Sequence, residues 1–259
     1  MPVLTIDNVS FSYLAGVPTL RNVSCTVQRG EFLTLIGPNG SGKSTLLKLL
    51  DRIFLPLEGA IYLEGKPLPS YTRTDLARRI AFVPQERETQ FPFTVEEIVL
   101  MGRAPHAGGR LFESVHDREI ARRMMDLTDI GHLADHAITN LSGGERQRAF
   151  IARALAQQAP VILLDEPTAY LDIAHQVEIF RLLRSLSTDS GLTVISVSHD
   201  LNLAAMHSDR IAMLQAGTLA ALGAPEDVLT ADRIRTVFKA DVLVDRHPKL
   251  DSPRVTVLR

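Results

Sequence analysis

The sequence has few of the features that mark secreted, membrane-spanning or nucleic-acid-binding chains. Its one cysteine, Cys25, excludes an internal disulfide framework. No stretch approaches the roughly 18–20 consecutive apolar residues that a bilayer-spanning helix needs, and the N-terminus lacks the basic region and apolar core of a secretory signal. The net charge of −2 argues against a protein held on nucleic acid by bulk electrostatics. We therefore expect a cytosolic chain without a nucleic-acid partner, although it can still dock onto a membrane protein.

The hydrophobic pattern predicts strands that alternate with helices. Strands are expected over residues 3–36 (several short ones), 58–65, 80–83, 161–164 and 193–198, with a hairpin over 209–222. Helices are expected from Thr94, over 117–135, after Leu141, over 173–187 and from Pro225. The alternation implies parallel βαβ units and an α/β fold class, in which functional groups gather at the carboxyl ends of strands.

Residues 37–44 read Gly-Pro-Asn-Gly-Ser-Gly-Lys-Ser, a complete G-x-x-x-x-G-K-[ST] run. The run follows the apolar stretch 32–36 and opens an apolar-periodic segment, which is the strand, loop and helix context of a phosphate cradle. The glycines let successive backbone N–H groups face one anion, and the helix dipole adds positive potential there. Lys43 is expected to reach the β- and γ-phosphates, and Ser44 to place its hydroxyl on Mg²⁺.

Three further segments carry polar residues just past strand ends, at Gln85, at Asp165 with Glu166, and at His199. Asp165 is suited to hold Mg²⁺, directly or through water. Glu166 lies one residue further on, where it can orient or deprotonate a water aimed at the γ-phosphate. A solvated acidic turn is the structural alternative for this pair.

The run Leu141-Ser142-Gly143-Gly144-Glu145 predicts a second anion site. Ser142 and Glu145 have capping-box spacing. Capping does not explain two adjacent glycines, which lower helix propensity and expose backbone N–H groups. Two phosphate-binding helix starts in one chain either serve one nucleotide within a single fold or belong to two copies that sandwich nucleotide between unlike sites.

These motifs together resemble the ATP-binding subunit of ATP-binding cassette (ABC) transporters over nearly the whole chain. Residues 37–44 are similar to the family's Walker A loop, 141–145 to its signature motif, and 161–166 to Walker B with its catalytic glutamate. Gln85 stands at the Q-loop position, His199 at the switch histidine, and Tyr13 at the aromatic that stacks on adenine. The stretch 169–172 resembles the D-loop, although Tyr170 replaces a smaller residue.

The resemblance implies a P-loop NTPase (RecA-like) core with an N-terminal antiparallel β subdomain over 1–86 and 159–259, and a helical subdomain over 87–158. It implies a homodimer in which each ATP, with Mg²⁺, lies between the P-loop of one copy and the signature of the other. The implied catalytic residues are Glu166, His199 and Gln85, and the implied metal-binding residues are Ser44, Gln85 and Asp165. The implied nucleotide-binding residues are Tyr13, Gly37, Pro38, Asn39, Gly40, Ser41, Gly42, Lys43, Ser44, Thr45, Ser142, Gly143 and Gly144.

The segment 93–106 resembles the region after the Q-loop in importers of iron-siderophores, haem and cobalamin. Such a subunit would work at the cytoplasmic face of the inner membrane with two transmembrane permease subunits, and indirectly with a periplasmic or lipid-anchored substrate-binding protein. Met101, Gly102 and Arg103 are expected near the surface that receives a loop of the membrane subunit. An export ATPase, a soluble DNA-repair ATPase and a P-loop kinase are the alternatives. The DNA-repair type carries a long coiled coil that residues 45–141 lack, and a kinase leaves 141–145 unexplained.

Overall fold

A computed structural model describes residues 2–14, 16–85, 91–110, 112–169 and 171–258. The chain forms two compact units, one made of residues 1–70 and 183–259 and the other of 71–182. The predicted helical subdomain, 87–158, covers fewer residues than the second unit, which also contains strands. The division of the chain into a core and a helical subdomain at these bounds therefore stays a prediction. Within the described ranges, no helix combines the length and the apolar character that a bilayer crossing requires.

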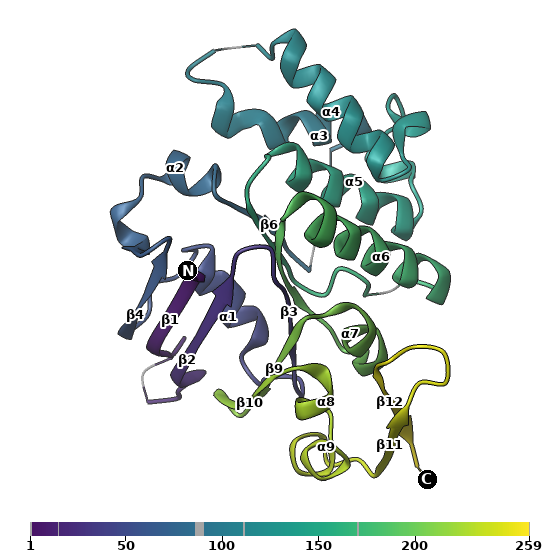
Figure 1. Cartoon of the computed structure of the whole chain (residues 1–259). Coiled ribbons are helices and arrows are strands. Elements are labelled where there is room, and N and C mark those ends of the chain that lie inside the picture. The colour runs from purple at the N-terminus through teal and green to yellow at the C-terminus, as the bar shows by residue number, and fades with distance from the viewer. Residues whose placement is uncertain (1, 15, 86–90, 111, 170, 259) are drawn as a thin grey trace. The chain divides into compact units, whose positions relative to one another are not determined.

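The first unit contains an antiparallel sheet with strand order β2-β1-β4-β5, visible at the purple end of Figure 1. Its strands are β1 (Pro2–Phe11), β2 (Leu20–Gln28), β4 (Glu58–Leu63) and β5 (Lys66–Pro67). A short 3₁₀ helix, η1 (Leu68–Ser70), follows. Alternating burial along β1 and β2 is typical of a sheet that packs one face on the core.

A second group of strands in the same unit positions the glycine-rich loop. β3 (Phe32–Ile36) pairs in parallel with β8 (Thr193–Val197) and β9 (Arg210–Gln215), and β9 pairs antiparallel with β10 (Thr218–Gly223). Every residue of β3 and β8 is buried, which explains their continuous apolar runs. The predicted hairpin over 209–222 is confirmed by β9 and β10.

Helices and a C-terminal hairpin complete the first unit. They are α1 (Lys43–Leu50), the end of α6 (Ile173–Ser190), α7 (Leu201–His207), α8 (Pro225–Val228), α9 (Ala231–Phe238) and the strand pair β11 (Val242–Arg246) and β12 (Pro253–Val257). One cluster of buried side chains joins Ile36 of β3 to α7, α8, α9 and the hairpin. This cluster anchors the strand that leads into the glycine-rich loop.

The second unit combines a parallel strand pair with packed helices (Figure 1). β6 (Ile80–Val83) pairs in parallel with β7 (Val161–Leu164). The helical elements are α2 (Arg73–Ala77), α3 (Val95–Leu100), η2 (Met101–His106), α4 (Val115–Leu127), η3 (Gly131–Leu133), η4 (Ile138–Asn140), α5 (Gly143–Ala156) and the first part of α6. Side chains of α3, α4 and α5 share one buried core.

Side-chain caps set where these helices begin. The predicted Thr94 cap is confirmed as a capping box with Glu97, and α4 begins with a capping box between Ser114 and Asp117. The helix predicted over 117–135 is too long, because α4 ends at Leu127 and Asp129 adopts a left-handed φ of 56°. Ile130 is buried after that turn rather than on the helix.

Candidate functional site

The glycine-rich loop of the first unit connects β3 to α1, as the sequence predicts. Gly37 has φ 148°, and a Cβ atom there would lie 2.2 Å from the carbonyl oxygen of Leu214, so no other residue fits without a backbone shift. Gly42, with φ 100°, is the residue before α1. The Ser41 carbonyl accepts a hydrogen bond from Gly217 N at 3.2 Å, which ties the loop to the β9–β10 turn. The loop conformation is therefore set by glycines and by the neighbouring strands.

Two polar side chains of this loop fit a phosphate ligand. The Lys43 ammonium is buried and donates to the carbonyl oxygens of Gly37 at 2.8 Å and Pro38 at 3.0 Å, so it lies within the loop. The Ser41 hydroxyl is also buried and has no hydrogen-bond partner among the described residues. A buried polar group without a partner costs free energy. An anion in the loop would satisfy Ser41 and neutralise Lys43.

His199 lies just past the end of β8, the strand that pairs with β3. The backbone of Ser198 donates to Leu35 O at 3.1 Å, which holds this end of β8 beside the strand that enters the glycine-rich loop. Asp200 caps α7 by accepting hydrogen bonds from the backbone N–H groups of Asn202 and Leu203. His199 is exposed between these two fixed points, so the sheet brings it to the edge from which residues 37–44 emerge.

Tyr13 belongs to a small aromatic cluster of the first unit. Its ring meets Phe11 and Phe54 edge to face, with centroid distances of 5.0 and 5.4 Å. Its hydroxyl lies 3.2 Å from Thr45 Oγ1 in the first turns of α1. Half of the Tyr13 side chain remains exposed. The cluster fixes an accessible ring next to α1, and the sequence alone did not indicate its Phe11 and Phe54 members.

In the second unit, the ends of β6 and β7 bring together Gln85, Asp165 and Glu166. The two strands are in register from Ile80 with Val161 to Val83 with Leu164, and Asp165 N donates to Val83 O at 2.9 Å. The Gln85 amide donates to the Glu166 carboxylate at 2.7 Å. Asp165 is buried, and Glu166 follows it with a left-handed φ of 49°. Their oxygens, with that of Gln85, are the donor types that Mg²⁺ prefers.

The run 141–145 forms the N-terminus of α5. Ser142 accepts from Glu145 N, and the Glu145 carboxylate accepts from the Ser142 backbone at 2.8 Å and from its hydroxyl at 2.7 Å, which confirms the predicted capping box. These bonds from Ser142 lower the pKa of the Glu145 carboxyl. Gly143 is exposed. Gly144 is packed against the His175 ring, where a Cβ would come within 3.2 Å of a ring carbon. Gly144 thus lies in tight contact with the His175 ring, which the sequence did not reveal.

The predicted site residues fall into two sets, one in each unit. Within the first unit lie Tyr13, residues 37–45 (including Pro38, Asn39 and Gly40, the last two exposed) and His199. Within the second lie Gln85, residues 142–144, Asp165 and Glu166. Tyr170 lies outside the described residues. Their roles toward nucleotide and metal stay predictions.

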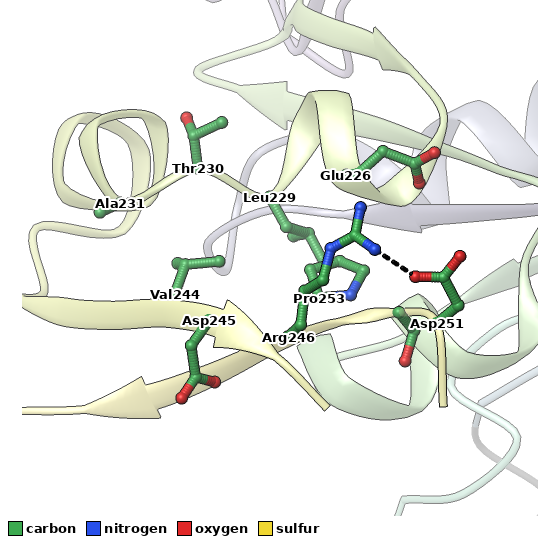
Figure 2. Close-up of a pocket in the computed structure, with 10 residues that line it drawn as sticks. Glu226, Leu229, Thr230, Ala231, Val244, Asp245, Arg246, Asp251 and Pro253 are labelled. Atoms are coloured by element: carbon green, nitrogen blue, oxygen red, sulfur yellow. Dashed lines mark hydrogen bonds and ion pairs between the residues drawn. The ribbon is translucent and has the colours of Figure 1, made fainter. Parts of the chain in front are cut away.

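A pocket of about 380 Å³ lies elsewhere in the first unit, between the C-terminal hairpin and α8 and α9 (Figure 2). Two of its lining residues, Arg246 and Asp251, form an ion pair with a 2.6 Å separation of nitrogen and oxygen. Its lining residues all fall within 226–253. They include none of the residues that the motifs single out, so this pocket is separate from the predicted nucleotide site.

Comparison with known proteins identifies the class. Residues 20–169, more than half of the chain, match the family described as "ABC transporter". The chain belongs to the ABC transporter family, it is an ABC-type ATPase, and its fold is the ATP-binding cassette of the P-loop NTPase type. This confirms the fold class and the family resemblance that the motifs indicate.

The similar proteins indicate which branch of the ABC transporter family this chain resembles. The chain is 42% identical to a petrobactin import ATP-binding protein of Bacillus anthracis, over 86% of this chain and 82% of that protein. It is 39% identical to the ferric enterobactin transport ATP-binding protein of Escherichia coli, over 92% and 88%. It is 44% identical to a hemin import ATP-binding protein of Gloeobacter violaceus, over 95% and 90%.

Solved structures agree with this placement. A metal-chelate type ABC transporter in an inward-facing conformation matches with a TM-score of 0.87 and 31% identity, covering 100% of this chain and 98% of that chain. An ATP-binding cassette in a dimeric, post-hydrolysis state bound to ADP and Pi matches with a TM-score of 0.76 and 32% identity, covering 86% and 98%.

Proposed function

We propose that this chain is the ATP-hydrolysing subunit of an importer that takes up an iron chelate (haem or a ferric siderophore) or cobalamin. The observation that carries the import assignment is the set of ATP-binding proteins that match over most of their length, which are named for petrobactin import, ferric enterobactin transport and hemin import. The segment 93–106 supports the same branch. The substrate would be selected by the membrane and binding-protein partners rather than by this subunit.

The proposed roles are those that the motifs imply, and local features of the structure support several of them. Lys43 and the loop backbone hold the β- and γ-phosphates, Tyr13 stacks on the base, and His199 donates to the γ-phosphate. Ser44, Gln85 and Asp165 hold Mg²⁺, which when bound neutralises charge on the phosphates. Glu166 orients the attacking water and accepts its proton. Its hydrogen bond to Gln85 holds the carboxylate in one direction.

We further propose a head-to-tail homodimer, in which Ser142, Gly143 and Gly144 of one copy complete the nucleotide site of the other. The support is the pair of glycine-rich helix starts, at α1 after Gly42 and at α5 after Ser142. A solved relative of this family is itself a dimer with ADP and Pi. The alternative, in which both turns serve one nucleotide in one copy, makes a different prediction for mixed variants.

The test mixes two inactive variants. Ser142→Arg leaves its own P-loop intact but spoils the partner's site, and Glu166→Gln binds ATP but slows its own hydrolysis by about 10²-fold or more. In a one-to-one mixture, half of the dimers are mixed, and each mixed dimer holds one intact site. ATP turnover should therefore recover to about a quarter of the wild-type rate. Turnover that stays at the level of the separate variants would rule out the head-to-tail arrangement.

Partners and location follow from the same proposal. Two transmembrane permease subunits would bind two copies of this chain at the cytoplasmic face of the inner membrane, and a periplasmic or lipid-anchored binding protein would deliver the substrate. The deciding experiment is to co-purify the permease and measure ATP-driven movement of haem, ferric siderophores and cobalamin across vesicles. Movement toward the binding-protein side would replace import by export, and no ATP-driven movement of any of the three would reject this substrate class.

A further inference from the structure

Arg103 is buried, in contrast to the prediction that it lies near the surface. Its side chain is 5% exposed, whereas the neighbouring Met101 is 42% exposed. The close approach of η2 to α5 explains the difference, because a Cβ at Gly102 would lie 2.1 Å from the carbonyl oxygen of Arg153. Gly102 therefore lets η2 pack on the last turn of α5, and the next side chain enters the interior of the second unit.

The buried guanidinium joins three elements. It donates to Asp117 Oδ1 of α4 at 3.0 Å, to the Ala156 carbonyl of α5 at 2.6 Å and to Gln158 Oε1 at 2.9 Å. Ala156 is the last residue of α5, where carbonyl groups lack helical partners and a cation is favoured by the helix dipole. Arg103 thus fixes the C-terminal end of α5 to η2 and α4.

Gln157 extends this connection to β6. Its side-chain amide donates to the carbonyl oxygens of Ala77 and Ile80, the latter at 2.7 Å, and Ile80 begins β6. Its own carbonyl lies 2.9 Å from His106 Nε2 of η2. A further bond runs from Arg78 Nε to Pro105 O at 2.9 Å, between the residues before β6 and η2. Hydrogen bonds therefore connect each of three segments to the other two: the start of β6, the end of α5, and η2.

The two elements held together here carry proposed site residues at their other ends. β6 runs from Ile80 to Val83 and is followed by Gln85, which bonds to Glu166. α5 begins after Ser142. We propose that Arg103 and Gln157 are positioning residues for ATP hydrolysis, because they lock β6 and α5 into one rigid body that keeps Gln85 and Ser142 at a fixed spacing. This proposal rests on the proposed function.

We expect a rigid body here because buried polar groups whose hydrogen bonds are all made have only one favourable arrangement. A planar guanidinium that serves a carboxylate and two carbonyl-type oxygens at once tolerates little sliding of η2 along α5. In a dimer, Gln85 acts at a copy's own ATP and Ser142 at the partner's, so a fixed spacing couples the two sites. Neither Arg103 nor Gln157 touches nucleotide in this scheme, so loss of either bond should slow turnover without weakening ATP binding.

The test compares Gln157→Met with a matched control. Met retains the length of the side chain but cannot donate to Ile80 O. Thr128→Val, in the same unit, removes the buried hydroxyl that donates to Met124 O and Met125 O, so both of the bonds that it loses lie at the end of α4. Both should lower the melting temperature by a few degrees. Gln157→Met should reduce kcat about tenfold or more while KM and nucleotide Kd stay within about twofold, and Thr128→Val should leave kcat unchanged.

Two results would overturn the proposal: wild-type kcat in Gln157→Met, or an equal fall of kcat in Thr128→Val, which would mean that turnover only follows stability. Arg103→Lys retains the charge but not the fork and should also lower kcat selectively. If Gln157→Met does not fold, amide hydrogen exchange of the wild-type chain provides the test. A rigid body predicts that the amides of Ala81–Val83 and those of the last turn of α5 exchange with the same opening free energy. Separate openings reject the rigid body.

These outcomes are independent of the larger assignment. If the wild-type chain does not hydrolyse ATP, or if Glu166→Gln turns ATP over at the wild-type rate, the proposed function fails before the positioning residues are tested. A normal wild-type rate with an indifferent Gln157→Met rejects only the positioning role.

Discussion

Alanine should weaken ATP binding at one glycine of the proposed phosphate-binding loop and leave it nearly unchanged at another. Both Gly37 and Gly40 have a positive φ, 148° and 76°. At Gly37 the added Cβ would lie 2.2 Å from Leu214 O, a backbone atom of β9, whereas ordinary contact begins near 3.4 Å. Because β9 is paired with β3 and β10, the loop rather than the strand must move, by about 1.2 Å. At Gly40 the added Cβ meets nothing within 4 Å.

The magnitudes follow from these distances. A loop displaced by about 1 Å loses the alignment of its donors, and losing two charge-assisted hydrogen bonds of about 1.5 kcal/mol each weakens ATP affinity about 100-fold. Gly40→Ala retains its N–H and meets only the left-handed backbone penalty of about 1–2 kcal/mol. It should lower the melting temperature by about 2–4 °C per kcal/mol and change ATP affinity less than about threefold.

Titration of each variant with a fluorescent ATP analogue, together with thermal unfolding, measures both quantities. The contrast within one loop is the control, since the two changes add the same atom to the same motif. Equal affinities in Gly37→Ala and Gly40→Ala, or normal binding by Gly37→Ala, would refute the reasoning that the Leu214 carbonyl fixes this loop.

Three further predictions concern single side chains. Lys43→Ala should weaken nucleotide binding about tenfold or more, because a buried charged donor is lost, and wild-type affinity by calorimetry would contradict the assignment. The pKa of Asp117 is held below its ordinary 3.8, mainly by the Ser114 hydroxyl, then by the Ser114 backbone N–H and by Arg103, against the opposing effect of burial, so the ionised carboxyl stabilises the fold above that pH. The melting-temperature advantage of wild type over Asp117→Asn should shrink as pH falls below about 4, and a constant difference would exclude this contribution. Burial raises the pKa of the Cys25 thiol to about 11, so a thiol reagent at pH 8 should label the folded chain far more slowly than the unfolded chain, and equal rates would show that Cys25 is accessible.

Some site features could be predicted from the sequence because all the residues that they need lie within one short segment. The eight residues 37–44 contain both the glycines that the backbone needs and the lysine that lies within the loop, and the capping boxes at Thr94 and Ser142 span only four residues each. The polar residues after apolar strands were likewise identifiable. That Gln85 would bond to Glu166, 81 positions away, depends on β6 and β7 being neighbours, which no local pattern encodes.

Arg103 shows where sequence reasoning fails. From the sequence, Arg103 is expected near the surface, together with Met101 and Gly102. The structure buries Arg103 because Asp117 supplies a counter-charge from another helix and Ala156 supplies a carbonyl from a third. A buried charge is tolerated only with such partners. Spacing within 103–110 cannot reveal partners that lie 14 and 53 positions further on.

The division of the site residues between the two units has a kinetic consequence. Under the proposed function, the groups that hold ATP in one copy, Lys43 and Tyr13, belong to the first unit. The groups that act only when bonds break or when a partner arrives, Glu166 and Ser142, belong to the second. Interactions made before the transition state set the nucleotide Kd, and those made only within it set kcat. Substitutions at Lys43 and Tyr13 should therefore act mainly on Kd, and those at Glu166 and Ser142 mainly on kcat. This separation is expected to hold for the positioning residues as well as for those that touch nucleotide.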